Sequence, residues 1–152
     1  AEFGGTDRRF QLHGQNRGVS VYDDFAHHPT EVRAALKAAK ASVGEGRIIT
    51  VFQPHLYSRT RIFYREFAEA LKISDVSIVT SIYAAREDPE PGVTANLITD
   101  LDPDQKKLLL VSDWEDVPAV AAGLAREGDF IVTMGCGDIY KMVPALLQAL
   151  EV

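Results

Sequence analysis

The 152-residue sequence has little of what would place it in a specialised class of protein. It has one cysteine, Cys136, which excludes an internal disulfide framework and is typical of a reducing cytosol. It has no apolar run approaching membrane length, and its first residues lack the pattern of a signal peptide. Its net charge of −6, without a basic tract, argues against binding to a nucleic-acid backbone. We therefore expect a cytoplasmic protein with no nucleic-acid or membrane partner.

The overall composition is that of an ordinary globular protein, because 46% of the residues are hydrophobic and 25% are charged. A length of 152 residues suits one domain with a full core, so we expect residues 1–152 to form a single domain. The sequence does not begin with Met, and its first residues run directly into a plausible strand. We therefore expect a domain excised from a longer protein, with a processed mature protein as the alternative.

Apolar and polar residues follow one another in a pattern that predicts helices and strands in alternation. Expected helices cover residues 31–43, 59–73, 93–101, 114–126 and 139–150. Expected strands cover residues 8–13, 19–24, 47–52, 76–82, 107–112 and 130–134, with a hairpin loop at 14–18. This alternation predicts an α/β fold, a Rossmann-like three-layer sandwich with a mostly parallel six-stranded sheet. The N-terminal hairpin adds one antiparallel strand, which we expect at an edge.

The most informative segment is residues 23–31, which read Asp-Asp-Phe-Ala-His-His-Pro-Thr-Glu. A strand pattern precedes it, and a helix pattern that begins near Pro29 follows it. In open α/β sheets, ligands bind at the carboxyl ends of strands and at the N-termini of helices. Two adjacent histidines exceed what a polar turn needs. We therefore interpret this segment as part of a binding site, with simple turn chemistry as the alternative.

Three further strand ends carry polar residues that we expect at the same edge. Residues 53–61 place Arg59 and Arg61 at a helix start, where the macrodipole disfavours cations. A planar guanidinium suits a carboxylate or phosphate, and the alternative is a solvent-facing pair bonded to nearby carbonyl groups. Residues 83–87 and the Gly-Cys-Gly-Asp of residues 135–138 follow the other two strands. Taken alone, this Gly-x-Gly favours a plain tight turn, with its cysteine as a small buried residue.

We do not expect a metal site. Asp23, Asp24, His27 and His55 could in principle surround a divalent ion, but no His-x-x-x-His or Cys-x-x-Cys spacing supports zinc. The acidic, proline-rich segment 87–92 is interpreted as a rigid, solvated connection between elements rather than as a metal-binding loop.

Four motifs together make the sequence resemble the C-terminal domain of the Mur ligase family. They are Asp-Asp-Phe-Ala-His-His-Pro-Thr-Glu at 23–31, Phe-Gln-Pro-His-Leu-Tyr-Ser-Arg-Thr-Arg at 52–61, Ile-Tyr-Ala-Ala-Arg-Glu at 82–87 and Gly-Cys-Gly-Asp-Ile at 135–139. The resemblance extends from about residue 3 to the end of the chain. It is strongest toward the family members that add L-alanine.

The resemblance implies part of an ATP-dependent ligase of peptidoglycan precursor synthesis, a process that serves the cell wall, cell shape and cell division. Such a ligase joins L-alanine to the lactyl carboxylate of UDP-N-acetylmuramate, using ATP and Mg²⁺. The carboxylate is first converted to an acyl phosphate, which the alanine amine attacks. An N-terminal domain holds the UDP-sugar, a central domain carries the phosphate-binding loop, and the C-terminal domain brings the amino acid.

The sequence contains no Gly-x-x-x-x-Gly-Lys-Ser/Thr motif. The resemblance therefore implies the third domain alone, inactive by itself, with the central and N-terminal domains of the same chain as its partners. It assigns Arg9 and Asp24 to ATP binding and His27, His28, His55, Arg59 and Tyr83 to the amino-acid site. In these roles Asp24 would accept hydrogen bonds from ribose hydroxyls. Arg59 would hold the alanine carboxylate by charge-assisted hydrogen bonds.

Two positions depart from the family pattern. Many members have Tyr where this sequence has Phe25, and many have Arg where it has Leu56. Without that arginine, Arg59 or Arg61 would take more of the carboxylate binding. Two alternative functions stay open: a sibling ligase that adds a peptide to UDP-N-acetylmuramate in cell-wall recycling, and a stand-alone nucleotide-binding module. A phosphate-binding loop upstream of residue 1 would exclude the module.

Overall fold

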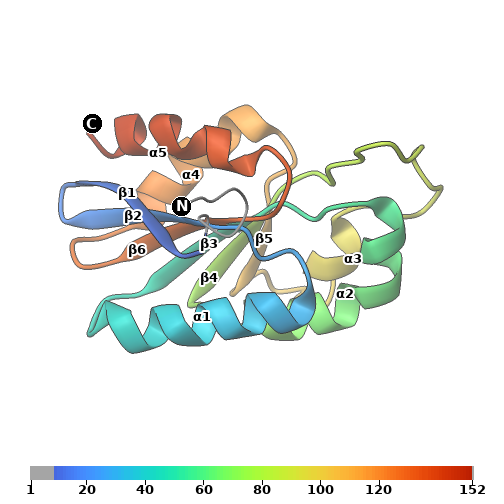
Figure 1. The fold of residues 1–152 in the computed structure, drawn as a ribbon, viewed down its shortest axis with the longest axis horizontal. Coiled ribbons are helices and arrows are strands. Elements are labelled where there is room, and N and C mark those ends of the chain that lie inside the picture. The colour runs from blue at the N-terminus through green and yellow to red at the C-terminus, as the bar shows by residue number, and fades with distance from the viewer. Residues whose placement is uncertain (1–8, 152) are drawn as a thin grey trace.

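The computed structural model of the chain describes residues 9–151 and shows a sheet between two layers of helices (Figure 1). Its strands are β1 (Gln11–Asn16), β2 (Val19–Asp24), β3 (Ile48–Phe52), β4 (Val76–Val79), β5 (Leu108–Leu110) and β6 (Phe130–Met134). Its α-helices are α1 (Pro29–Val43), α2 (Tyr57–Leu71), α3 (Asn96–Thr99), α4 (Val117–Leu124) and α5 (Val143–Leu150). Short 3-10 helices, η2 (Trp114–Asp116) and η3 (Ile139–Met142), precede α4 and α5. The predicted α/β sandwich is confirmed.

The sheet has six strands in the order β1-β2-β6-β3-β4-β5. β1 and β2 pair antiparallel and the other pairs are parallel, so β1 is the antiparallel edge strand that the sequence predicts. Strand β3 lies between β6 and β4, and all five of its residues are buried. Its uninterrupted apolar sequence follows from this position, because helices cover both faces of a central parallel strand.

The N-terminal hairpin differs from the prediction in its bounds. The expected strand at residues 8–13 began at Arg8, which lies outside the described residues, whereas β1 runs to Asn16. The hairpin loop is only the two-residue turn of Arg17 and Gly18, whose φ angles of 54° and 78° both suit a tight hairpin. Gly14 belongs to β1, and a Cβ atom there would come 3.0 Å from a leucine side chain of α5. Close packing, rather than a turn, explains why this position is a glycine.

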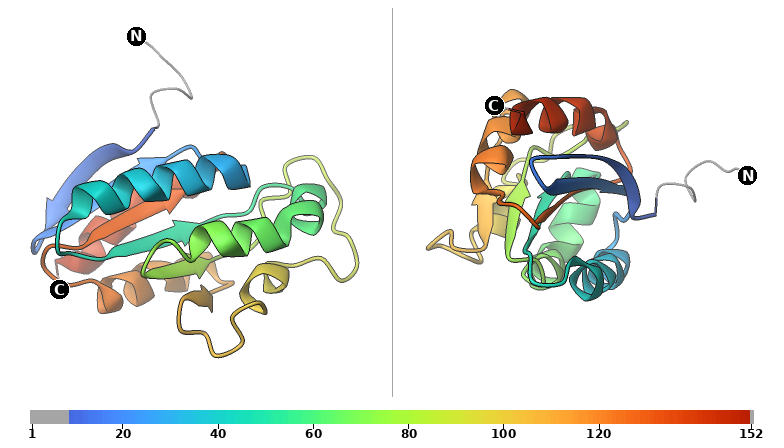
Figure 2. Two further views of the ribbon diagram at one scale, coloured as in Figure 1. Left: turned by 90° about the horizontal axis from the view of Figure 1, so that it is seen from below. Right: turned by 90° about the vertical axis from the view of Figure 1, so that its left-hand side faces the viewer.

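Helices α1, α2 and α3 cover one face of the sheet, while α4 and α5 cover the other (Figure 2). In α1, Val32, Leu36 and Ala39 are buried at helical spacing, so one stripe of the helix faces the sheet. Val117 of α4 and Leu146 of α5 are fully buried in the core on the opposite face. An apolar core therefore lies on each face of the sheet.

Other elements lie within a few residues of their predicted bounds. Strands β4 and β5 are shorter than predicted, and the expected helix at residues 93–101 is reduced to the single turn of α3. The helices expected at residues 114–126 and 139–150 each begin as a 3-10 turn before α4 and α5. Both α4 and α5 have Pro in the first turn, where a missing N–H leaves no hydrogen bond unmade.

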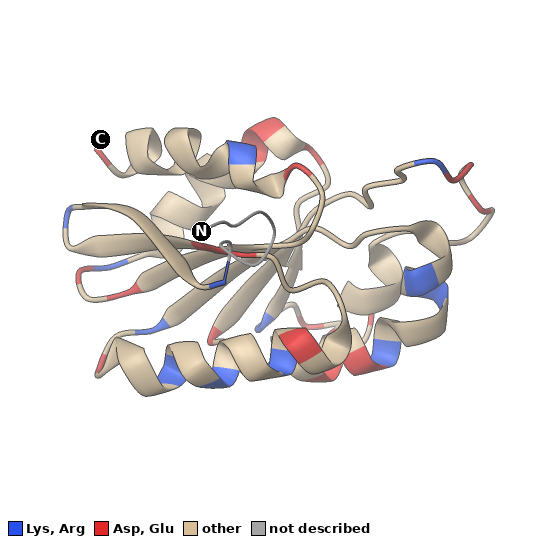
Figure 3. Cartoon of the chain, in the orientation of Figure 1, with Lys and Arg blue, Asp and Glu red and all other residues tan. Residues whose placement is uncertain are grey.

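The carboxyl ends of β2, β6, β3 and β4 meet at one edge of the sheet, because these strands are parallel neighbours. We call this the carboxyl edge, and the opposite one the amino edge. Charged residues lie mainly on helices and loops, with few on the strands (Figure 3). The loops at the two edges are therefore the places where polar chemistry can gather.

Candidate functional site

A double link holds the loops after β3 and β4 together at the carboxyl edge. The Leu56 N–H donates to the carbonyl of Tyr83 at 2.9 Å, and the Tyr83 N–H donates to the carbonyl of Pro54 at 2.8 Å. His55 and Tyr83 form an isolated parallel bridge, and their rings stack with centroids 5.6 Å apart and planes at 17°. Two loops that are distant in the sequence therefore present one continuous surface.

Arg59, in the first turn of α2, contacts the ring of His55. The distance from Nη1 of Arg59 to Nδ1 of His55 is 3.1 Å. Because a guanidinium can only donate, Nδ1 must be the accepting nitrogen and the imidazole must be neutral. Burial, followed by electrostatic interactions with Arg59 and His27, lowers the pKa of His55, with Glu87 acting in the opposite direction. His55 therefore orients the guanidinium without adding positive charge at pH 7.

His27 lies beside this pair, with its ring centroid 6.3 Å from that of His55. Its Nδ1 is 3.0 Å from the carbonyl oxygen of Phe25 and 3.4 Å from Oε1 of Glu31. A carbonyl oxygen can only accept, so Nδ1 carries the proton in this contact. In the neutral ring, Nε2 is then the nitrogen with a lone pair. The loop after β2 thus adds a proton acceptor to the surface that carries Arg59.

His28 has different surroundings. Its ring lies 4.9 Å from the ring of Phe63 in α2, and its carbonyl accepts from the N–H of Val32 at the start of α1. The side chain thus packs between two helices, while its neighbour in sequence faces the loops. The structure brings His27, His55, Arg59 and Tyr83 together, and it places His28 apart from them.

Asp24 and Arg9 belong to a second part of the carboxyl edge. Asp24 is 6% exposed, and its Oδ1 and Oδ2 each accept at 2.8 Å, from the N–H groups of Ala26 and Phe10. Burial raises the pKa of this carboxyl, against the lowering effect of the two hydrogen bonds and of nearby Arg9. A cavity of about 390 Å³ adjoins the carboxylate, lined by Arg9, Phe10, Asp24, Phe25, Ala26, Thr30, Glu31, Ala34, Ala35 and Ala38. It joins one cation, Arg9, and two acids, Asp24 and Glu31, to an apolar wall of α1.

Three residues that lie in the sequence motifs, but had no individual role assigned, support this surface. Nε2 of Gln53, at the end of β3, donates to Oδ1 of Asp138 at 2.9 Å and so ties together the loops after β3 and β6. A Cβ atom on Gly137 would lie 2.8 Å from Cγ of Tyr83. The second glycine of Gly-x-Gly is therefore needed for close packing against the site. Cys136, expected to be buried in this turn, is partly exposed.

The backbone at the start of α2 is strained. Leu56, the residue before the helix, has φ 74° and ψ 136°. This conformation is uncommon for a residue with a side chain, and such strain is often stored at functional sites. Leu56 is also a position at which the sequence departs from the family pattern. Arg61, the other cation of residues 53–61, forms an ion pair of 3.0 Å with Glu90. Glu90 belongs to segment 87–92, which the sequence predicts to be a solvated connection.

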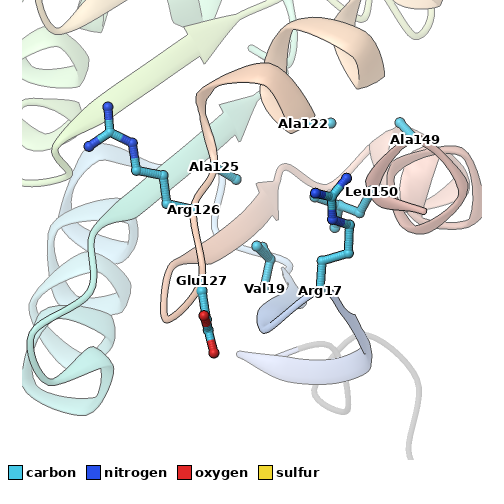
Figure 4. Close-up of a pocket in the computed structure, with 8 residues that line it drawn as sticks. All are labelled: Arg17, Val19, Ala122, Ala125, Arg126, Glu127, Ala149 and Leu150. Carbon is cyan, nitrogen blue, oxygen red and sulfur yellow. The ribbon is translucent and has the colours of Figure 1, made fainter. Parts of the chain in front are cut away.

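A larger cavity, of about 620 Å³, lies at the amino edge between α4, α5 and the hairpin (Figure 4). It is lined by Arg17, Val19, Ala122, Ala125, Arg126, Glu127, Ala149 and Leu150. The side chain of Arg126 points away from it in Figure 4. None of the residues proposed from the sequence lines this cavity, whose walls combine charged residues with small or apolar ones. We therefore place the candidate site at the carboxyl edge, despite the smaller cavity there.

Among residues 9–151, no group of three or more His, Cys, Asp or Glu side chains is arranged to hold a metal ion. No helix within the same described range is both long and apolar enough to cross a membrane.

The fold and the carboxyl edge define an α/β domain with a cation and a neutral imidazole side by side at the carboxyl ends of its parallel strands. Over residues 8–137 the chain matches the family described as Mur ligase, glutamate ligase domain. UDP-N-acetylmuramate–L-alanine ligase of Clavibacter michiganensis is 55% identical over 152 residues, which cover 99% of this chain and 32% of that protein. The chain belongs to the Mur ligase family.

Two solved structures share the fold. The murein peptide ligase from Psychrobacter arcticus has a TM-score of 0.74 at 26% identity, covering 95% of this chain and 30% of that one. UDP-N-acetylmuramate–alanine ligase from Thermotoga maritima has a TM-score of 0.73 at 26% identity, covering 93% of this chain and 29% of that one. This chain thus spans about a third of the length of the relatives that it matches.

Proposed function

We propose that this chain is the amino-acid-binding domain of a ligase that joins L-alanine to UDP-N-acetylmuramate. The rest of the protein would supply a central domain for ATP and an N-terminal domain for the UDP-sugar. The observation that carries the proposal is the guanidinium of Arg59, held 3.1 Å from a neutral His55 at the carboxyl edge. Identity of 55% with a ligase named for L-alanine supports this amino acid as the substrate.

Each residue of the site would have a distinct task. Arg59 would bind the carboxylate of L-alanine through two parallel hydrogen bonds. His55, bonded to one side of the guanidinium, would fix its orientation. His27 would lie near the amine, where its Nε2 lone pair could accept the proton that the amine loses on attacking the acyl phosphate. Proximity and orientation of the amine would be the main contribution of this domain.

ATP would approach the second part of the carboxyl edge. Arg9 would neutralise phosphate charge, and the Asp24 carboxylate, which adjoins the cavity, would accept from ribose hydroxyls through its remaining lone pairs. The cavity of about 390 Å³ beside them has the apolar wall that a nucleoside needs. MurF ligase from Thermotoga maritima, which shares this fold at 21% identity and a TM-score of 0.64, was solved in complex with ADP. Mg²⁺ would accompany ATP, and we assign none of its ligands to residues 9–151.

A ligase that adds a peptide is the second candidate, because the murein peptide ligase is as similar in fold as the alanine ligase from Thermotoga maritima. The fold therefore does not separate the two functions. The chain is 55% identical to the alanine ligase of Clavibacter michiganensis and 26% identical to the murein peptide ligase. This difference in identity favours L-alanine.

The test is a ligation assay on the full-length protein with UDP-N-acetylmuramate, ATP and Mg²⁺. L-alanine or the tripeptide L-alanyl-γ-D-glutamyl-meso-diaminopimelate is added as the acceptor. Product mass and phosphate release should show turnover with L-alanine and none with the tripeptide, and the 152-residue chain alone should be inactive. Preference for the tripeptide, or turnover by the chain alone, would contradict the proposal.

A further inference from the structure

The first turn of α2 has no stabilising groups of its own. Leu56, at the N-cap, makes no side-chain hydrogen bond, and the turn contains no acidic residue. It carries Arg59 instead, with Arg61 just beyond it, although the positive end of the helix macrodipole disfavours cations. The helix start that would present Arg59 to a substrate therefore needs an anion from elsewhere in the chain.

Glu87, in the loop after β4, supplies this anion. Its Oε1 accepts from the N–H of Ser58 at 3.0 Å, and its Oε2 accepts from Oγ of the same serine. The hydrogen bond from the Ser58 side chain, followed by the one from its backbone, lowers the pKa of Glu87. The carboxylate thus caps α2 from a position 29 residues further along the chain.

The loop that carries Glu87 is itself held at both ends. Tyr83, at its beginning, is bonded to the loop before α2 by the paired backbone hydrogen bonds described above. Ala85 has a left-handed φ of 55°, and the Glu87 N–H donates to the carbonyl of Ala84 at 2.9 Å, which turns the chain back toward α2. Further along, Glu90 pairs with Arg61. The acidic loop therefore has a fixed register against the helix.

We propose that Glu87 is a positioning residue for amino-acid recognition. It holds Ser58, the residue before Arg59, while His55 holds the guanidinium from the other side. Because Glu87 accepts from the N–H of Ser58, that N–H does not compete for the substrate. The guanidinium of Arg59 is then the group that receives the substrate carboxylate. The inference rests on the proposed function, because it concerns the same amino-acid site.

The test uses the full-length ligase with the variants Glu87→Ala, Glu87→Gln and Ser58→Ala. Glu87→Ala should raise KM for L-alanine about tenfold, the loss expected for one charge-assisted hydrogen bond. Its kcat and its KM for ATP and UDP-N-acetylmuramate should stay near wild type. Glu87→Gln should recover part of the loss, since it keeps one accepting oxygen, and Ser58→Ala should have a smaller effect than Glu87→Ala. The matched control is Asp88→Asn, which removes the charge of the exposed neighbouring acid in the same loop and should leave KM for L-alanine unchanged.

Two results would overturn the inference while leaving the proposed function intact. One is an unchanged KM for L-alanine in folded Glu87→Ala or Glu87→Gln, when Arg59→Lys does raise it. The other is a loss of melting temperature with an equal change for all three substrates, which would indicate a structural role alone. A wild-type protein that does not ligate L-alanine would overturn the proposed function and this inference together.

Discussion

The two edges of the sheet differ in how their charged side chains are bonded. At the amino edge, Asp129 and Asp75 accept from backbone N–H groups and from cations of the loops that they join. At the carboxyl edge, Asp24 and Glu87 also accept from backbone N–H groups, but beside them a cation and two imidazoles contact one another. We infer from this comparison that the contacts among polar side chains, rather than cavity size, indicate where the site lies.

Asp129 is the clearest case at the amino edge. Its Oδ1 accepts from the N–H of Arg47 at 2.8 Å, and its Oδ2 accepts from the N–H of Arg126 at 2.8 Å and from Nη2 of Arg47 at 3.1 Å. Asp75 similarly accepts from the N–H of Ile48 at 2.8 Å and from Lys40 at 3.0 Å. Burial raises the pKa of Asp75, but these hydrogen bonds and the nearby lysines outweigh it, so the net pKa is lowered.

The largest effect on stability is expected for Asp129→Ala. The substitution leaves two backbone N–H groups and part of Arg47 without an acceptor, at a cost of about 3 kcal/mol. Denaturant unfolding of the chain should show this loss in the free energy of unfolding. In the full-length ligase, KM for L-alanine should not change. A large change in that KM with little loss of stability would place functional chemistry at the amino edge. The two edges would then no longer differ in function.

A pair of glycine substitutions sharpens the comparison. Gly137→Ala would push against Cγ of Tyr83 at 2.8 Å, and Gly46→Ala at the amino edge would meet the carbonyl oxygen of Gly128 at 1.9 Å. Overpacking costs about 1–3 kcal/mol, so both should lower the melting temperature, Gly46→Ala more strongly. Only Gly137→Ala should also raise KM for L-alanine, because Tyr83 supports His55. Equal kinetic effects of the two variants would contradict this account.

A smaller effect is expected from pH, and its sign follows from His55. The folded-state pKa lies below the ordinary value of about 6.5, so the ring is neutral above that pH and accepts from Arg59. A group with a depressed pKa contributes stability that is present above its unfolded pKa and is lost as pH falls through its folded pKa. KM for L-alanine should therefore stay flat as pH falls to about 6.5, and rise only at the lower pH at which His55 of the folded protein becomes protonated. His55→Gln should remove this acidic rise, and a rise that persists in the variant would assign it to another group.

The sequence was sufficient for the layered fold because hydrophobic periodicity and strand–helix alternation are local signals. It also located the carboxyl edge, since parallel strands must end on the same side. It could not locate residues whose partners are distant in the sequence. Asp129 is 82 residues from Arg47, and Glu87 is 29 residues from Ser58. Nothing in the local pattern around either acid indicates which backbone group it will meet.

The sequence drew attention to certain glycines and to the adjacent histidines, but it did not indicate the role of each. Gly14 suggested a loop and Gly137 a plain turn, yet both positions lack a side chain because a neighbouring side chain packs against the backbone. His27 and His28 appeared as one motif, but the start of α1 directs the two rings to different surroundings. The roles assigned to all seven site residues from the resemblance stay predictions until substrates are tested.

The most direct test of the central claim is the KM for each substrate in the Arg59→Lys ligase, compared with Arg61→Lys. Lysine keeps the positive charge but loses the planar fork, so KM for L-alanine should rise about tenfold in Arg59→Lys. KM for ATP and UDP-N-acetylmuramate should stay near wild type, and Arg61→Lys, whose cation already pairs with Glu90, should change none of the three. If Arg59→Lys changes no KM, or changes all three equally, the carboxyl edge is not the amino-acid site.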